Sequence, residues 1–242
     1  MNLIFPYSSY VFFGILPSII WLLFYLRKDV HPEPNRMIIK IFFFGMLATL
    51  PIISFTVLAE VFNFSKSINI FIGSSIYLRI LYIFVGIALV EEFLKYLVVK
   101  GKILTNPELD EPTDVILYMI IAALGFAALE NLLYLFPTLS SISHTAVYSG
   151  ARFIGATFLH ALCSGVFGYF LALSIYKTNK RKMFLLIGLF VASFLHGLYN
   201  FSIMEMTGIL SLLIPIIILI CLAVFLSFAF KDLKKLKSVC KI

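Results

Sequence analysis

Long apolar runs separated by short polar segments dominate the chain. A helix needs about 20 apolar residues to cross a bilayer. Seven runs reach that length: Ser9–Leu26, Met37–Phe62, Tyr77–Lys100, Val115–Phe136, Arg152–Tyr176, Lys182–Met204 and Gly208–Phe230. We therefore predict an all-α, polytopic transmembrane helical bundle of about seven spans. The segment Phe62–Tyr77 fits either a loop or a short re-entrant segment, which leaves an eighth span open.

The composition agrees with a membrane protein and excludes an ordinary soluble domain. Of the 242 residues, 62% are hydrophobic and 13% are charged, whereas soluble chains are about half apolar and about a quarter charged. A soluble fold of this length could not bury so much apolar surface. Seven spans leave only short connections, so we expect one integral membrane domain over residues 1–242. Any chemistry must then take place within the bilayer.

The basic residues lie in alternate connections and in the C-terminal tail. They follow the first, third and fifth runs and end the chain: Arg27, Lys28 and Arg36; Lys100 and Lys102; Lys177, Lys180, Arg181 and Lys182; Lys231, Lys234, Lys235, Lys237 and Lys241. Positive charge marks the cytosolic side of membrane proteins. This predicts an outside N-terminus and a cytosolic C-terminus in the cell membrane. Because the charge is spread along span ends, the net charge of +7 indicates the lipid bilayer as partner and no nucleic acid.

Two polar connections have a predicted structural role. The acidic stretch Thr105–Asp114 fits a solvated loop that caps the fourth span. The connection Pro137–Gly150 is rich in Ser and Thr and fits a polar loop, with a lid over an outward-facing site as the alternative.

Ionisable and polar side chains recur inside four of the predicted spans. A charged group in the hydrocarbon core costs about 2.5 to 3.5 kcal/mol on insertion scales, so such groups face the bundle interior and usually mark function. They are Glu91, Glu92 and Lys95 in the third span, Glu130 and Asn131 in the fourth, Arg152 and His160 in the fifth, and His196 and Asn200 in the sixth. Together they predict a functional site within the bundle.

Helical spacing indicates which of these groups act together. Glu91 and Lys95 are four residues apart and share a helix face, as do His196 and Asn200. Two adjacent glutamates cannot both ionise cheaply in a low dielectric. One of Glu91 and Glu92 must therefore be paired with Lys95 or carry a proton near neutral pH, which suits a general acid or base.

The estimated depths of these residues in the membrane are similar. At a rise of 1.5 Å per residue, Glu130 lies about 24 Å from the inner end of its span and His196 about 21 Å, while His160 lies about 12 Å from the outer end of its own. All three fall in the outer half of the membrane, and Glu91 lies nearer the middle. These four residues are our candidates for a divalent metal site such as zinc, and a metal-free glutamate mechanism fits equally well.

Carboxylates and imidazoles in this combination suit the activation of water for hydrolysis. Asn200 and a histidine would donate hydrogen bonds to a developing oxyanion. The chain lacks a His-Glu-x-x-His zinc helix and an intramembrane Gly-x-Gly-Asp. It also lacks Gly-x-Ser-Gly, since Leu162 precedes Ser164-Gly165 at the required position. A non-proteolytic alternative is a proton-coupled transporter or a scaffold that uses the same groups, although the chain shows no inverted repeat.

Five motifs, in this order and spacing, resemble the PrsW family of intramembrane proteases. They are Lys28-Asp29-Val-His-Pro32-Glu33-Pro34, Glu91-Glu92-x-x-Lys95, Phe126-x-x-x-Glu130-Asn131, Arg152 followed by His160-Ala-Leu, and His196-Gly-Leu-Tyr-Asn200. That family is similar to the CAAX prenyl endopeptidases and bacteriocin-processing proteins. In that larger group the second motif ends in histidine, whereas this chain has Glu130. The difference favours the PrsW branch over a CAAX-type prenyl endopeptidase, which remains the enzymatic alternative.

The resemblance implies cleavage of a membrane-anchored anti-sigma factor on its outer side, the first cut of a stress-signalling cascade. We assign hypothetical roles accordingly: Glu91 as general base, Glu92 as its partner or held by Lys95, Glu130 and His160 as groups that orient the water or bind a metal, and His196 and Asn200 on the oxyanion side. Lys95 and Asn131 support the site, and Arg152 is expected to anchor its span at the outer interface.

Overall fold

The structure is a computed structural model that describes residues 4–27, 31–62, 64–104, 109–136 and 141–236. Every regular element among these residues is helical, so the all-α prediction is confirmed. Six helical segments are long and apolar enough to cross a membrane, and one bent pair of helices would make a seventh. The predicted seven spans therefore require the bent pair to count as one span.

The elements follow one another with short connections. In chain order they are α1 (Ile4–Leu26), α2 (Asn35–Leu47), α3 (Leu50–Val61), α4 (Phe64–Gly73), α5 (Ile76–Leu81), a π-helical segment η1 (Tyr82–Leu89), α6 (Val90–Lys102), α7 (Pro112–Leu135), α8 (Ile142–Ile154), α9 (Ala156–Tyr176), a 3-10 turn η3 (Thr178–Lys180), α10 (Arg181–Glu205) and α11 (Leu210–Leu233).

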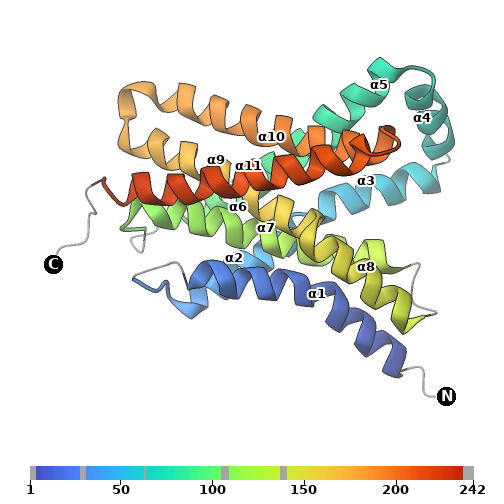
Figure 1. Cartoon of the computed structure of the whole chain (residues 1–242), viewed down its shortest axis with the longest axis horizontal. Helices are drawn as coiled ribbons and strands as arrows, with labels where there is room; N and C mark the ends of the chain where they lie inside the picture. Colours follow the sequence, from blue (N-terminus) through green and yellow to red (C-terminus); the bar gives the residue numbers. More distant parts are fainter. Residues whose placement is uncertain (1–3, 28–30, 63, 105–108, 137–140, 237–242) are drawn as a thin grey trace.

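The long helices run side by side along the long axis of the molecule (Figure 1). α1 begins at one end of the molecule, and α11 finishes at the opposite end. α1, α6 and α9 end, and α2, α7 and α10 begin, at the end of the molecule where α11 finishes (Figure 1). The basic connections are thus gathered at one end, as predicted. Which end faces the cytosol stays a prediction.

α7 is the central helix of the bundle. All of its residues from Pro112 to Ala128 are buried, and it packs against α1, α2 and α9. A helix that is apolar around its whole circumference belongs in the interior. α9, its main partner, is buried over most of its length as well. These two helices carry Glu130, Asn131 and His160, so the protein-buried centre of the fold holds the candidate site.

Glycines let α2 approach α7 at backbone contact distance. A Cβ atom on Gly125 would lie 2.0 Å from the carbonyl oxygen of Phe42, and one on Gly45 would lie 2.2 Å from that of Ala122. Small residues at helix crossings allow this approach in membrane proteins, where van der Waals packing replaces the hydrophobic drive.

The second apolar run forms two helices rather than one. α2 ends at Leu47, and α3 begins at Leu50 after a two-residue turn. Pro51 lies in the first turn of α3, where its missing N–H breaks the preceding helical hydrogen bonds. Residues 35–61 nevertheless still qualify as one candidate span.

The segment between the second and third runs is helical in its described part, so the loop alternative was wrong. α4 covers Phe64–Gly73 and joins the helix that starts at Ile76 through a bend of 118°. Ser75 caps that next helix by accepting a hydrogen bond from the amide of Tyr77. Such a bent pair is either a broken span or a re-entrant loop.

The prediction of a polar loop over Pro137–Gly150 was also wrong for its described part, because Ile142–Gly150 is helical. Ser141 caps α8 by accepting from the amide of His144, and the Ser149 hydroxyl donates to the Phe13 carbonyl at 2.6 Å. The serines and threonines that suggested a loop serve as a helix cap and as contacts to α1. Residues 137–140 lie outside the described residues.

The acidic connection caps α7, as predicted. Glu111 and Asp114 form a reciprocal capping box, in which the Glu111 amide donates to Asp114 at 2.7 Å. His31 lies 2.5 Å from Glu111 and ties the connection between α1 and α2 to this cap. Residues 105–108 of the stretch are outside the described part of the chain.

We expect Gly125→Ala to destabilise the protein by about 1–3 kcal/mol, because the added methyl group meets rigid backbone and overpacks the α2–α7 contact. Gly101→Ala is the matched control, since a Cβ there meets nothing within 4 Å. Thermal unfolding in detergent, followed by circular dichroism, measures both variants. An equal effect of the two substitutions would contradict the close α2–α7 contact.

Candidate functional site

The polar residues predicted inside the spans come together from four helices. α6 carries Glu91, Glu92 and Lys95, and α7, α9 and α10 carry the remaining ones. α9 packs against both α7 and α10, and α10 packs against η1, which leads directly into α6. The fold therefore brings to one place groups that are more than 100 residues apart in the chain, such as Glu92 and His196.

Two local features position α6 and α10 for this contact. The π-helical segment η1 ends at Leu89, two residues before Glu91, and π-helical turns are frequent at functional sites. Gly197 lies against the ring of Phe84 in η1, where a Cβ would lie 2.6 Å from the ring. The absence of a side chain at this position brings α10 close to η1, which places His196 beside the two glutamates.

Glu92 is fully buried and fully engaged. Its carboxylate accepts hydrogen bonds from Lys95 Nζ at 2.7 Å and from Ser164 Oγ at 2.7 Å, and it lies 3.0 Å from His196 Nδ1. A buried carboxylate is tolerated when a charge partner and further hydrogen bonds compensate for lost hydration. Glu92 therefore holds its neighbours in place, in agreement with the expectation that Lys95 binds it.

Glu91 differs from Glu92 in that one of its buried carboxylate oxygens is unpaired in the described part of the chain. Its side chain is 8% exposed, and its Oε2 atom has no hydrogen-bond partner among the described residues. The nearest charged or imidazole nitrogens are His196 Nε2 at 3.7 Å, and His160 Nδ1 and Lys95 Nζ at 3.9 Å each. An unsatisfied buried carboxylate oxygen is costly, so the space between Glu91 and the two imidazoles suits a cation or a polarised water.

Each of the two histidines binds a carboxylate through its far nitrogen. His160 Nε2 lies 2.8 Å from Glu130, and His196 Nδ1 lies 3.0 Å from Glu92. The remaining nitrogen of each ring faces Glu91, and the rings are nearly perpendicular with centroids 5.0 Å apart. Metal-binding histidines almost always have this outer hydrogen bond, which fixes the tautomer and the ring orientation.

Glu91, His160 and His196 fit a divalent metal. Each offers one ligand atom, and the three atoms all lie within 4.8 Å of one another. Two imidazoles and one carboxylate, with a fourth position left for water, form a known catalytic zinc ligand set. Lys95 Nζ lies 2.7 Å from His160 Nδ1, so a cation would compete with this ammonium group for the same lone pair.

Arg152, which we expected to anchor its span at the outer interface, contacts two other residues of the candidate site. Its guanidinium donates to Glu130 at 2.7 Å and to the side-chain oxygen of Asn131 at 2.5 Å. Asn131 in turn donates to Thr157 Oγ1 at 3.0 Å. The helix breaks at Gly155 between α8 and α9. The sequence analysis treated the fifth apolar run as one straight span from Arg152, and a straight span does not predict these contacts.

Glu130 lies behind His160 rather than beside Glu91. It bridges the His160 ring and Arg152, and it is not among the three residues whose ligand atoms cluster. The structure thus brings Glu130 into the site as a support for His160. Ser164, which we had considered only for a serine-protease motif, is the residue that sequence reasoning missed. Its spacing of four residues from His160 put both on one face of α9.

A cavity of about 370 Å³ opens beside Glu91 and the two histidines. Asn200 lines it one helical turn from His196, and Arg152 and Glu130 also contribute to its wall. At about 30 Å³ per water molecule, this volume holds about a dozen waters. The site therefore has room for both a hydrolytic water and a stretch of extended peptide within the bundle.

Comparison with known proteins gives one consistent family. Residues 33–229 match the family model described as PrsW family intramembrane metalloprotease. The chain is 33% identical over 209 residues to Protease PrsW of Oceanobacillus iheyensis (86% of this chain, 88% of that protein). It is 32% identical over 194 residues to that of Geobacillus kaustophilus (79% and 78%), and 28% identical over 228 residues to that of Bacillus subtilis (93% and 94%). No solved structure shows significant similarity to the chain.

We expect the purified chain to bind about one zinc ion, as a site with three protein ligands does, and His196→Ala to abolish that binding. Ser193→Ala is the matched control, because Ser193 is buried in the same helix with no hydrogen-bond partner among the described residues. Metal analysis after chelator treatment and reloading measures the stoichiometry. Full zinc content in the His196 variant would exclude this ligand set.

Glu130→Gln separates a supporting role from a ligand role. Loss of the carboxylate behind a metal-binding histidine lowers affinity about 10–100-fold, so we expect weakened but measurable zinc binding, while His160→Ala shows none. Competition with a zinc chelator of known affinity gives both values. Equal and complete loss in the two variants would instead make Glu130 a direct ligand.

Proposed function

The chain belongs to the PrsW family of intramembrane metalloproteases, and we propose that it hydrolyses a peptide bond of a membrane-anchored protein near the outer side of the cell membrane. The observation that supports this most is the buried cluster of Glu91, His160 and His196 beside a cavity inside the helical bundle. Hydrolysis within a membrane requires an enclosed, polar space of this kind, because the surrounding hydrocarbon excludes water.

Glu91 is the best candidate for the proton acceptor. Glu92 is held by Lys95 and Glu130 by Arg152, both at 2.7 Å, whereas the nearest ammonium to Glu91 lies at 3.9 Å. Glu91 is therefore the one carboxylate of the three that is not neutralised at hydrogen-bond distance. It takes a proton from the attacking water and returns it to the amine that leaves.

His160 and His196, together with Glu91, would hold a divalent cation. When bound, such a cation makes water more nucleophilic and polarises the peptide carbonyl. A carboxylate that binds through one oxygen keeps the other for the proton, so the ligand role and the base role of Glu91 are compatible. Glu92 and Glu130 fix the two imidazole rings through their far nitrogens.

Asn200 provides the oxyanion side. Asn200 lies on the cavity wall together with Glu91 and His196, and its side-chain amide would donate a hydrogen bond to the oxygen that becomes negative as water attacks. One such preorganised donor contributes about 10²–10³ to the rate in other proteases.

The cavity supports cleavage near the outer face. Its wall includes Tyr134 and Met204, which lie in the last turns of α7 and α10. Both helices finish at the end of the molecule opposite to the one where α11 finishes (Figure 1). If the basic connections are cytosolic, substrates enter from the outer half of the bilayer. A single-pass anti-sigma factor cut first on its outer side, as the resemblance implies, has the required topology.

We expect Glu91→Gln and His196→Ala to reduce cleavage of a single-pass substrate in proteoliposomes by at least about 10²-fold, because each removes a group that acts on the attacking water. Glu60→Gln is the carboxylate control, since Glu60 is exposed on α3. The readout is the cleaved fragment on a gel. The same reaction with an anti-sigma factor and with a prenylated CAAX peptide distinguishes the two substrate classes. Cleavage at the wild-type rate by both site variants would contradict the proposal.

A further inference from the structure

A second and larger cavity lies away from the candidate site, between α1 and α11. Its volume is about 710 Å³, and its walls are mostly aromatic and aliphatic. α1 and α11 both pack against α7 and α9, but in the described residues they have little contact with each other. α9 therefore forms the floor of a groove that is open between the two outer helices. We refer to it as the α1–α11 groove.

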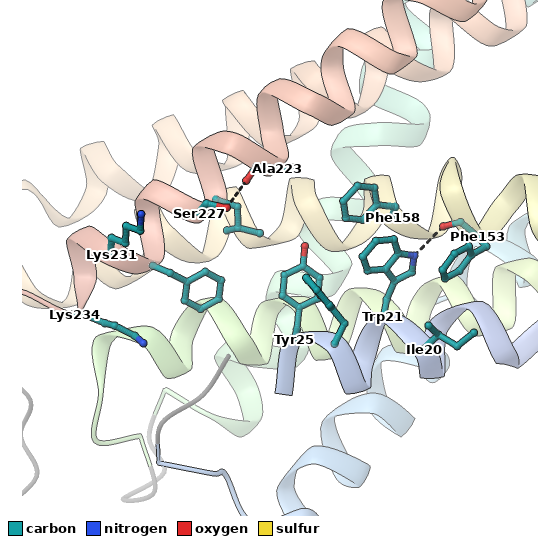
Figure 2. A pocket seen from close by; sticks show the side chains of 12 residues that line it. Ile20, Trp21, Tyr25, Phe153, Phe158, Ala223, Ser227, Lys231 and Lys234 are labelled. Atoms are coloured by element: carbon teal, nitrogen blue, oxygen red, sulfur yellow. Dashed lines mark hydrogen bonds between the residues drawn. The ribbon is translucent and has the colours of Figure 1, made fainter. Parts of the chain in front are cut away.

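The groove changes from basic to apolar along its length (Figure 2). Lys231 and Lys234 stand at one end, near the end of α11, and Trp21, Phe153 and Phe158 stand at the other. Ala223 and Lys231 are eight residues apart, so the apolar section extends about 12 Å inward from the lysines at 1.5 Å per residue. Tyr25 and Ser227 lie between the two ends.

Away from the lysines, the polar side-chain atoms of Trp21 and Ser227 are already engaged within the protein. The Trp21 ring stacks on Phe158 with centroids 4.0 Å apart, and its N–H donates to the Phe153 carbonyl at 2.9 Å. The Ser227 hydroxyl likewise donates to the Ala223 carbonyl at 2.9 Å. Hydrocarbon is therefore the chemistry that this part of the groove accepts.

The basic end, in contrast, has charge to offer. Both lysines are exposed, and neither has an ion-pair partner within the described part of the chain. Two acids of this region are already engaged. Asp232, which follows Lys231 in the chain, accepts from Tyr169, and Glu111, which lines a small cavity together with Lys234, lies 2.5 Å from His31. An anion is thus the complementary partner for this end of the groove.

We propose that the α1–α11 groove binds an anionic phospholipid, with its phosphate at Lys231 and Lys234 and an acyl chain along Trp21 and Phe158. The lysines alone would accept any anion, and the apolar section alone would accept any hydrocarbon. Only a molecule that joins a negative headgroup to a long chain satisfies both ends at once. Basic pockets between membrane helices bind anionic headgroups in this way.

Trp21 is a built-in reporter, because it is the single tryptophan of the chain and lies in the groove. Lipids with brominated acyl chains quench tryptophan fluorescence on contact. In vesicles with equal fractions of brominated lipid, we expect phosphatidylglycerol to quench Trp21 in preference to phosphatidylcholine. Each lysine near an anionic headgroup contributes about fivefold, so the expected preference is about thirtyfold.

Variants at the two ends of the groove test the assignment. Lys231→Gln with Lys234→Gln should abolish the preference for phosphatidylglycerol, whereas Lys180→Gln with Lys182→Gln removes the same charge outside the groove and should preserve it. Ala223→Phe should reduce quenching by both lipids, because it fills the apolar section. Circular dichroism verifies that each variant is folded.

Three outcomes would overturn the proposal. If the preference for phosphatidylglycerol survived the Lys231 and Lys234 changes, the lipid would bind elsewhere. Glycerol phosphate, which has no acyl chains, would compete as well as the lipid if the lysines were a simple anion site. A neutral single-span peptide would displace the brominated lipid if the groove were a docking site for a protein helix.

Discussion

Charge that is removed from water must be paired, and this constraint determines the centre of the structure. The ionic groups of the site form one connected set, in which Lys95 joins Glu92 to His160, and His160 joins Lys95 to Glu130. Arg152 continues it from Glu130 to Asn131. The set connects α6, α7, α8, α9 and α10, so the same contacts that compensate for desolvation also fix the relative positions of the helices. Removal of one partner from a buried pair typically costs 3–5 kcal/mol.

The pairing is incomplete at one residue, and that residue is the reactive candidate. Every other carboxylate in the set has a cation within hydrogen-bond distance, while Glu91 Oε2 has none among the described residues. A site in which all groups were satisfied would be stable but inert. The surrounding network compensates for the cost of this one unsatisfied oxygen. The oxygen faces His196 Nε2 and His160 Nδ1, and the latter nitrogen also contacts Lys95.

The sequence predicted those features that the membrane makes expensive. Apolar length predicted the spans, and the cost of buried charge identified Glu91, Glu92, Lys95, Glu130 and His160 as inward-facing. Features whose burial in the membrane costs little free energy were not predicted. Ser164 is one hydroxyl in an apolar helix, where a serine is cheap because it can bond to its own backbone. Only its spacing of four residues from His160 indicated that it lies near Glu92. The contacts of Arg152 with Glu130 and Asn131 were not foreseen, because hydropathy does not reveal the break at Gly155. The segment Ile142–Gly150 was misjudged because capping serines have the composition of a loop.

The α8–α9 junction is the structural element that the two cavities share. Arg152 and Phe153 are adjacent at the end of α8, yet Arg152 reaches the catalytic candidates while the Phe153 carbonyl accepts from Trp21 in the α1–α11 groove. The break at Gly155 allows this division, because it ends one helix and begins another between the two sites. Tyr199 of α10 lies against the same glycine, at 2.6 Å from where a Cβ would be. A side chain at residue 155 would therefore press on the Tyr199 hydroxyl and, at 3.0 Å, on the Ala151 carbonyl oxygen. The contact of α10 with the α8–α9 junction thus depends on a residue that has no chemistry of its own.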